Sequence, residues 1–324
     1  MDLPPFHPHP LFRGGHGQTI AGGIWPLRLQ PRHSRAHRVE LPDGDAVMLH
    51  EDEPQGEERP QIVLLVHGLG GSRNSGYVRR TAAKLNARGV RTFRIDLRGH
   101  GSSATTARHP GHAGRSEDIA AALDWITHRR PQRPRLLVGF SLGANIVLKT
   151  AAEYAAEPFA PARVFAVAPP LDLALCAENL TFGSATWYDR IFVRSALARV
   201  KPLTRAGVIA GPLLTPPPRR LLDFDERFTA PRSGFSGAAE YYTKSASGPL
   251  LPQIAAPTII LAAADDPIIP VRMFANLQAP SHVRVLTTPA GGHVGYIGRR
   301  GVDADRCWLD WRIVDWVLAD STPG

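Results

Sequence analysis

Residues 135–152 read RLLVGFSLGANIVLKTAA, and this stretch decides the fold. A short apolar run, typical of a buried strand, leads into Gly139-Phe140-Ser141-Leu142-Gly143, and a helical stretch follows. A G-x-S-x-G sequence on a sharp strand-to-helix turn lifts its serine hydroxyl above the sheet. Glycine is expected at both flanks, because a side chain there would clash with the strand or the helix. The free N–H groups at the start of the helix favour a developing negative charge, so Ser141 is the candidate nucleophile.

Apolar strands and amphipathic helices alternate on both sides of this turn. Strands are predicted at residues 62–66, 90–95, 136–138, 164–167, 258–262 and 283–286, helices at 77–88, 116–129, 142–154 and 305–318, and a hairpin at 39–50. This order favours an α/β fold in which helices flank a mostly parallel central sheet.

Residues 171–250 interrupt the alternation. They contain helical stretches, three consecutive prolines and many aromatic residues. We interpret them as a helical cap inserted between two strands, and ordinary peripheral helices are the alternative. The chain is therefore expected to form an N-terminal arm, residues 1–37, and one domain, residues 38–324, that contains the insertion.

The chain of 324 residues carries a formal net charge of +9. Its positive charges are scattered rather than gathered in one stripe, which argues against nucleic-acid binding. They are densest in the N-terminal arm, which we expect to be a solvated tail, with peripheral contact to an anionic membrane surface as the alternative. Cys176 and Cys307 are expected to be reduced and buried. With no signal-like N-terminus and no apolar run of ~20 residues, we expect a soluble, cytoplasmic protein without an integral membrane segment.

Two loops that follow late strands supply partners for Ser141. The strand at 258–262 leads into Asp265-Asp266-Pro267, where the fold type requires an acid that orients a histidine. We assign this role to Asp266, and Asp265 and Asp172 are the alternatives. The strand at 283–286 leads into a glycine-rich loop that holds His293, the predicted general base.

The negative oxygen that forms when a serine attacks an ester needs preorganised hydrogen-bond donors. We expect these to be the backbone N–H groups of Leu142 and Leu69, the latter in a glycine-rich loop at residues 67–71. That loop lacks the G-x-G-x-x-G spacing of a dinucleotide site. His100 follows a different strand and is interpreted as structural. No cluster has the spacing of metal ligands, so we expect neither a metal nor a cofactor.

Four stretches of the chain resemble the YheT-like branch of the α/β-hydrolases, bacterial relatives of eukaryotic abhydrolase-type lipid esterases. They are GHGQTI at 15–20, HGLGGS at 67–72, a segment from Phe224 to Tyr242, and the two loops that hold Asp266 and His293. One departure is Gly17, where the group usually has leucine. The likeness runs from about residue 12 to the final helix and implies an α/β-hydrolase fold. It also implies carboxylic ester hydrolysis, and eukaryotic relatives act on medium-chain acyl esters or phospholipids or transfer acyl groups to alcohols.

These observations together predict a serine esterase that cleaves a small-molecule carboxylic ester through an acyl-Ser141 intermediate. The aromatic insertion favours an apolar acyl group of short or medium length. Transfer of the acyl group to an alcohol uses the same chemistry and is the first alternative. A non-catalytic binding protein on the same scaffold is the second, and an intact set of serine, histidine and aspartate argues against it.

Overall fold

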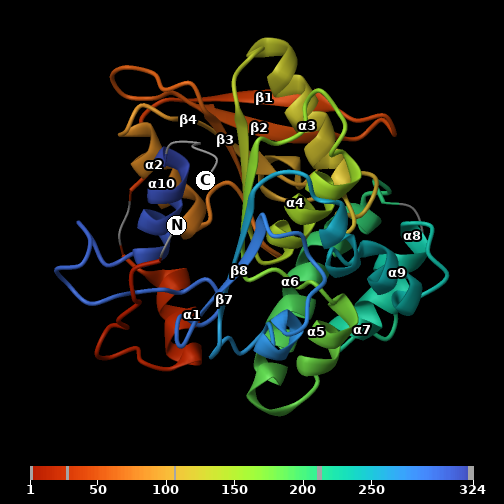
Figure 1. The fold of residues 1–324 in the computed structure, drawn as a ribbon. Coiled ribbons are helices and arrows are strands. Elements are labelled where there is room, and N and C mark those ends of the chain that lie inside the picture. The colour runs from red at the N-terminus through yellow and green to blue at the C-terminus, as the bar shows by residue number, and fades with distance from the viewer. Residues whose placement is uncertain (1–2, 27–28, 106, 210–213, 320–324) are drawn as a thin grey trace.

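An eight-stranded sheet forms the centre of the molecule, with its strands in the order β1-β2-β4-β3-β5-β6-β7-β8 (Figure 1). The computed structural model describes residues 3–26, 29–105, 107–209 and 214–319. The strands are β1 (Ser34–Glu40), β2 (Ala46–Asp52), β3 (Ile62–Val66), β4 (Arg91–Asp96), β5 (Arg135–Phe140), β6 (Arg163–Val167), β7 (Thr258–Ala263) and β8 (Val283–Thr288). The predicted hairpin forms β1 and β2. Both β1–β2 and β2–β4 pair antiparallel, and every later pairing in the sheet is parallel.

Helices cover both faces of the sheet. Figure 1 shows α2 (Gly76–Asn86) and α10 (Trp308–Leu318) on one face and α3 (Ser116–Arg129) and α4 (Leu142–Glu153) on the other. Strands β3 and β7 are buried at every residue, because helices on both faces exclude water from them. The predicted α/β architecture is therefore confirmed, and the carboxyl ends of the parallel strands lie at one edge, where a site can be assembled.

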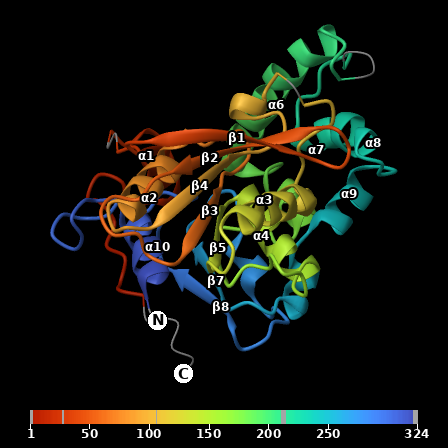
Figure 2. The same cartoon turned by 90° about the horizontal axis from the view of Figure 1, so that it is seen from above.

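Residues 168–257, between β6 and β7, hold a group of helices that Figures 1 and 2 both show to one side of the sheet. They are α5 (Leu173–Asn179), the 3-10 turn η2 (Gly183–Ala185), α6 (Thr186–Arg205), α7 (Leu221–Phe224), the π-helical turn η3 (Asp225–Thr229), α8 (Ala230–Arg232), α9 (Ala238–Ser245) and the 3-10 segment η4 (Gly248–Gln253). We call this group the helical insertion. Short 3-10 turns also follow β4, at η1 (Gly101–Ser103), and β7, at η5 (Val271–Phe274). Within the described residues, no helix is both long and apolar enough to cross a bilayer.

The N-terminal segment is not the solvated tail that its many arginine and histidine residues predicted. Phe6 is only 8% exposed, and its ring centroid lies 5.2 Å from that of Tyr296. A helix, α1 (Gly15–Ile24), packs on the loop after β8, where buried Gln18 accepts a hydrogen bond from the Ile297 N–H at 2.7 Å. Glycines permit this close approach, because a Cβ on Gly22 would lie 2.6 Å from the Gly295 Cα. The arm thus packs on the folded body through Phe6 and α1, and its last residues form the start of β1 at Ser34.

Candidate active site

Ser141 occupies the sharp turn between β5 and α4, as predicted. Its φ of 54° and ψ of −123° lie in a region that non-glycine residues rarely adopt, at a cost of about 1–3 kcal/mol. The Ser141 N–H donates to the Val167 carbonyl on β6 at 2.8 Å, which anchors the turn. A Cβ on Gly139 would lie 2.5 Å from the Gly143 carbonyl oxygen, and one on Gly143 would lie 2.4 Å from the His67 carbonyl oxygen. Both glycines are therefore required by packing.

Three predicted residues meet in one hydrogen-bonded chain. The His293 Nε2 lies 2.8 Å from the Ser141 Oγ, and its Nδ1 lies 2.9 Å from the Asp266 Oδ2. The other carboxylate oxygen of Asp266 accepts from the N–H groups of Ile268 at 2.8 Å and Ile269 at 3.0 Å. Because a carboxylate only accepts hydrogen bonds, we assign the shared proton to the His293 Nδ1, which leaves Nε2 facing the serine hydroxyl as an acceptor.

The two alternative acids lie elsewhere. The Asp172 side chain caps the N-terminus of α5, where it accepts from the Leu175 N–H at 2.9 Å. The Asp265 side chain accepts from the Gly292 N–H at 2.8 Å, so it holds the loop that carries His293. The Asp265 side chain therefore links the loop after β7 to the loop after β8.

Thr19 on α1 is a supporting residue that the sequence argument missed. Its hydroxyl accepts from the His293 N–H at 2.9 Å and donates to the Gly15 carbonyl at 2.7 Å. A Cβ on Gly15 would lie 1.7 Å from the Asp265 carbonyl oxygen. The GHGQT stretch thus braces both loops behind Ser141. Its short glycine-rich run was singled out only by family resemblance, since it has no clear helical hydrophobic pattern.

The peptide between Gly68 and Leu69 is held in a fixed orientation. The Leu97 N–H donates to the His67 Nε2 at 3.3 Å, so the His67 Nδ1 is protonated and donates to the Gly68 carbonyl at 2.8 Å. The Gly71 N–H donates to the same carbonyl at 3.0 Å. In a trans peptide the N–H points opposite to the carbonyl, so the Leu69 N–H is turned away from His67. Burial lowers the pKa of His67, which keeps its ring neutral.

The loop that carries Leu69 lies directly against the serine. A Cβ on Gly68 would lie 3.5 Å from the Ser141 Oγ, and Leu69 and Leu142 both line the cavity that contains Ser141. Within the described residues, neither the Leu69 N–H nor the Leu142 N–H donates a hydrogen bond to another protein group. Two backbone donors are therefore available beside the serine hydroxyl.

A largely apolar cavity separates Ser141 from the helical insertion. More than half of its lining comes from the insertion, including Phe192, Leu203, Phe224, Phe228, Tyr241 and Tyr242. Cys176 is free, buried and part of the same wall, and Cys307 is free and buried directly before α10. Both thiols are therefore reduced and buried, as predicted.

Asp225 and His100 are among the buried titratable groups that line this cavity. Burial raises the pKa of Asp225 to about 6, although the Thr229 and Tyr242 hydroxyls donate to its carboxylate at 2.7 and 2.8 Å. Burial lowers the pKa of His100 to about 3, and its Nδ1 donates to the Arg98 carbonyl at 2.8 Å. His100 thus stabilises the turn after β4, as the structural interpretation predicted.

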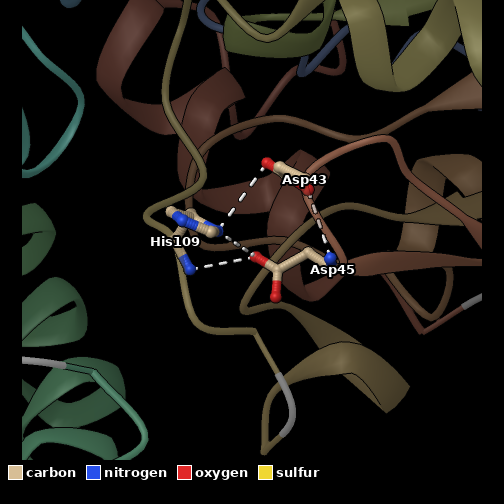
Figure 3. A group of neighbouring side chains, drawn as sticks. All are labelled: Asp43, Asp45 and His109. Atoms are coloured by element: carbon tan, nitrogen blue, oxygen red, sulfur yellow. Dashed lines mark hydrogen bonds and ion pairs between the residues drawn. The ribbon is translucent and has the colours of Figure 1, made fainter.

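An acidic cluster lies at the turn of the β1–β2 hairpin (Figure 3), and its His109 also lines the Ser141 cavity. The ligand atoms of Asp43, Asp45 and His109 lie within 4.8 Å of one another, a spacing that suits a metal ion. However, the guanidinium of buried Arg98 donates to both carboxylates, at 3.2 Å in the case of Asp45. The Arg108 N–H also donates to Asp45 at 2.8 Å. The Arg98 guanidinium therefore supplies the positive charge that a metal ion would otherwise provide. We infer that this cluster stabilises the hairpin turn.

Comparisons with known proteins agree with this geometry. The family described as the alpha/beta hydrolase fold matches residues 61–299. The chain is 31% identical to the Escherichia coli protein named "Putative esterase YheT", over 86% of this chain and 83% of that one. It is 28% identical to "Medium-chain fatty acid ethyl ester synthase/esterase 2" of Saccharomyces cerevisiae, over 85% of this chain and 64% of that one.

A solved structure supports the same fold. The esterase Pf2001 of Pyrococcus furiosus superposes with a TM-score of 0.55 at 15% identity, covering 88% of this chain and 92% of that one. At such low identity the superposition bears on the fold alone. The family match covers well over half of the chain, and the similarity to YheT covers most of it. The chain therefore belongs to the alpha/beta hydrolase fold family, in its YheT-like branch.

Proposed function

We propose that this protein is a serine hydrolase that cleaves a carboxylic ester through an acyl-Ser141 intermediate. The observation that carries the proposal is the hydrogen-bonded chain from Ser141 through His293 to Asp266, which ends at an apolar cavity. A serine hydroxyl becomes a useful nucleophile only when a neighbouring base takes its proton. The hydrogen-bond distance between the His293 Nε2 and the Ser141 Oγ supports His293 as that base, and its contact with Asp266 supports the required tautomer.

In the first half of the reaction, the Ser141 Oγ attacks the ester carbonyl while the His293 Nε2 takes its proton. The carbonyl oxygen becomes negative, and the N–H groups of Leu69 and Leu142 stabilise it. Asp266 remains ionised and stabilises the imidazolium. His293 then gives the proton to the leaving alkoxide as the ester C–O bond breaks, which leaves the acyl group on Ser141.

In the second half, water takes the place of the alcohol. His293 removes a proton from the water as its oxygen attacks the acyl carbonyl, and it returns that proton to the Ser141 Oγ as the acid leaves. The apolar wall of the helical insertion supports an acyl group of short or medium length. A relative whose name refers to medium-chain fatty acid ethyl esters agrees with that choice.

A series of p-nitrophenyl esters, from acetyl to palmitoyl, tests this function with the purified protein and with Ser141→Ala. We expect an optimum at a short or medium chain and a loss of turnover of about 10⁴–10⁶-fold in the variant. Hydrolysis by Ser141→Ala at the wild-type rate would refute the mechanism.

A further inference from the structure

Arg199 is a charged residue of the helical insertion that lines the same cavity as Ser141. It lies on α6, and its Nη1 donates to the Ser195 Oγ at 2.7 Å. A Cβ on Gly70 would lie 3.5 Å from this Nη1. Because Gly70 directly follows Leu69, the guanidinium lies against the loop that carries the proposed oxyanion donor Leu69.

The positive charge of Arg199 has no counter-ion in the part of the chain that the structure describes. Its hydrogen-bond partner among the described residues, Ser195, is neutral and occupies only one of its five N–H donors. Burial lowers the pKa of Arg199, and no carboxylate offsets that effect. The neighbouring rings of His67 and His100 both have lowered pKa values, so they are neutral and add no charge of their own. A partly buried cation without a counter-ion is costly, and an anion on the substrate would offset that cost.

A second polar group, His100, lines the same cavity and lies close enough to Arg199 that its pKa is lowered by burial and also by the guanidinium. His100 lines the cavity and is only 7% exposed, and its Nε2 is buried without a hydrogen-bond partner among the described residues. Since the His100 Nδ1 donates to a carbonyl, this Nε2 carries a free lone pair. Phe192, Leu203 and Phe228 line the cavity as apolar residues. The cavity thus combines an apolar wall with one guanidinium, that of Arg199, which has no counter-ion among the described residues, whereas its Asp225 carboxylate is already hydrogen-bonded to Thr229 and Tyr242. This combination matches an amphiphilic ligand rather than a plain hydrocarbon ester.

We propose that Arg199 forms an anion-binding subsite of the Ser141 cavity, and that the natural ester carries a carboxylate or phosphate group that binds there. This inference rests on the proposed ester hydrolysis and names the class of substrate within it. A guanidinium binds either oxyanion through two parallel N–H···O bonds. The position of the anion on the acyl or the alcohol side of the ester follows from the experiment below.

The test uses two pairs of esters that differ in charge. In the first pair, mono-p-nitrophenyl suberate carries a carboxylate at the end of its acyl chain, and p-nitrophenyl octanoate is its neutral counterpart. In the second pair, 1-octanoylglycerol 3-phosphate carries a phosphate on the alcohol side of the ester, and 1-octanoylglycerol is its neutral counterpart. The readout is the ratio of kcat/KM for the charged ester to that for its neutral partner, in the wild type, Arg199→Gln and Arg199→Lys. The control is Arg194→Gln, which removes an exposed arginine from the same helix.

We expect Arg199→Gln to lower this ratio by about 10- to 100-fold in one of the two pairs, mainly through KM. Arg199→Lys should retain part of the preference, and Arg194→Gln should retain all of it. The pair that responds identifies the anion and its side of the ester. Equal ratios in the wild type and Arg199→Gln for both pairs would overturn the subsite.

A binding measurement separates the subsite from the chemistry. Calorimetric titration of octyl phosphate and of octanoate into Ser141→Ala requires no turnover. We expect Ser141→Ala/Arg199→Gln to bind at least one of them about tenfold or more weakly. Equal affinity of the two proteins for both ligands would overturn the subsite, whereas weaker binding alongside an absence of ester hydrolysis in the wild type would refute only the proposed function.

Discussion

Thr19→Val should reduce activity although Thr19 belongs to the N-terminal helix and not to the reacting groups. The substitution keeps the shape of the side chain and removes the hydroxyl that accepts from the His293 N–H at 2.9 Å. It also leaves the Gly15 carbonyl without the bond it receives at 2.7 Å. Leaving a buried backbone donor unpaired costs about 1–3 kcal/mol, and the loop that carries His293 can relieve that cost by moving.

Such a movement would displace the His293 Nε2, which lies 2.8 Å from the Ser141 Oγ. A shift of about 1 Å at a reacting group can cost about 100-fold in rate. We therefore expect kcat/KM for p-nitrophenyl butyrate to fall about 10- to 100-fold, chiefly in kcat. Thr19→Ser keeps the hydroxyl and should stay within about threefold of the wild type. Urea unfolding of each variant shows that the assayed protein is folded.

Two results would refute this reasoning. One is wild-type activity in Thr19→Val, which would mean that α1 does not position His293. The other is an equal loss in Thr19→Val and Thr19→Ser, which would assign the effect to packing rather than to the hydroxyl.

Three further predictions follow from individual contacts. In Asp266→Asn the amide oxygen can keep the two backbone donors, and the NH₂ group then faces the His293 Nδ1. This donor moves the ring proton from Nδ1 to Nε2, so that Nε2 can no longer accept the serine proton. We therefore expect kcat to fall about 10⁴-fold in the ester assay without a matching loss of stability. Gly143→Ala places a Cβ 2.4 Å from a backbone oxygen and should lower the free energy of unfolding by about 3 kcal/mol in urea melts. The control is Gly14→Ala, which has nothing within 4 Å of the new Cβ and should leave the free energy of unfolding unchanged. Burial raises the pKa of Asp225 to about 6, so the folded state holds its proton more tightly than the unfolded state and stability falls as pH rises from about 4 through 6. Asp225→Asn should therefore gain about 2 kcal/mol relative to the wild type between pH 4.5 and pH 8, and a pH-independent difference would contradict this assignment.

The sequence predicted those features that rest on short-range patterns. Fully apolar runs located the central strands, because a strand covered on both faces must be apolar throughout. Ser141 was identifiable because only glycine fits on either side of its turn. The loops that hold Asp266 and His293 follow from the order of strands, since the carboxyl ends of parallel strands meet at one edge.

Other features depend on contacts between distant segments, which no local pattern records. The N-terminal arm that contains GHGQT is predicted to be a solvated tail, because the positive charges of the chain are densest there. Its role comes from glycines that let α1 approach the loop after β8, nearly 280 residues later in the chain. The position of Arg199 beside Gly70 likewise depends on how the helical insertion folds back over the sheet.

The most direct test of the central claim is covalent labelling with a fluorophosphonate, followed by mass spectrometry of the labelled peptide. The reagent reacts with a serine only when a neighbouring base activates it. The account predicts one phosphonyl group per protein, located on Ser141, no such adduct in Ser141→Ala, and much slower labelling in His293→Ala and Asp266→Asn. Labelling of another residue would contradict the account. So would labelling of Ser141 at the same rate in the wild type, His293→Ala and Asp266→Asn.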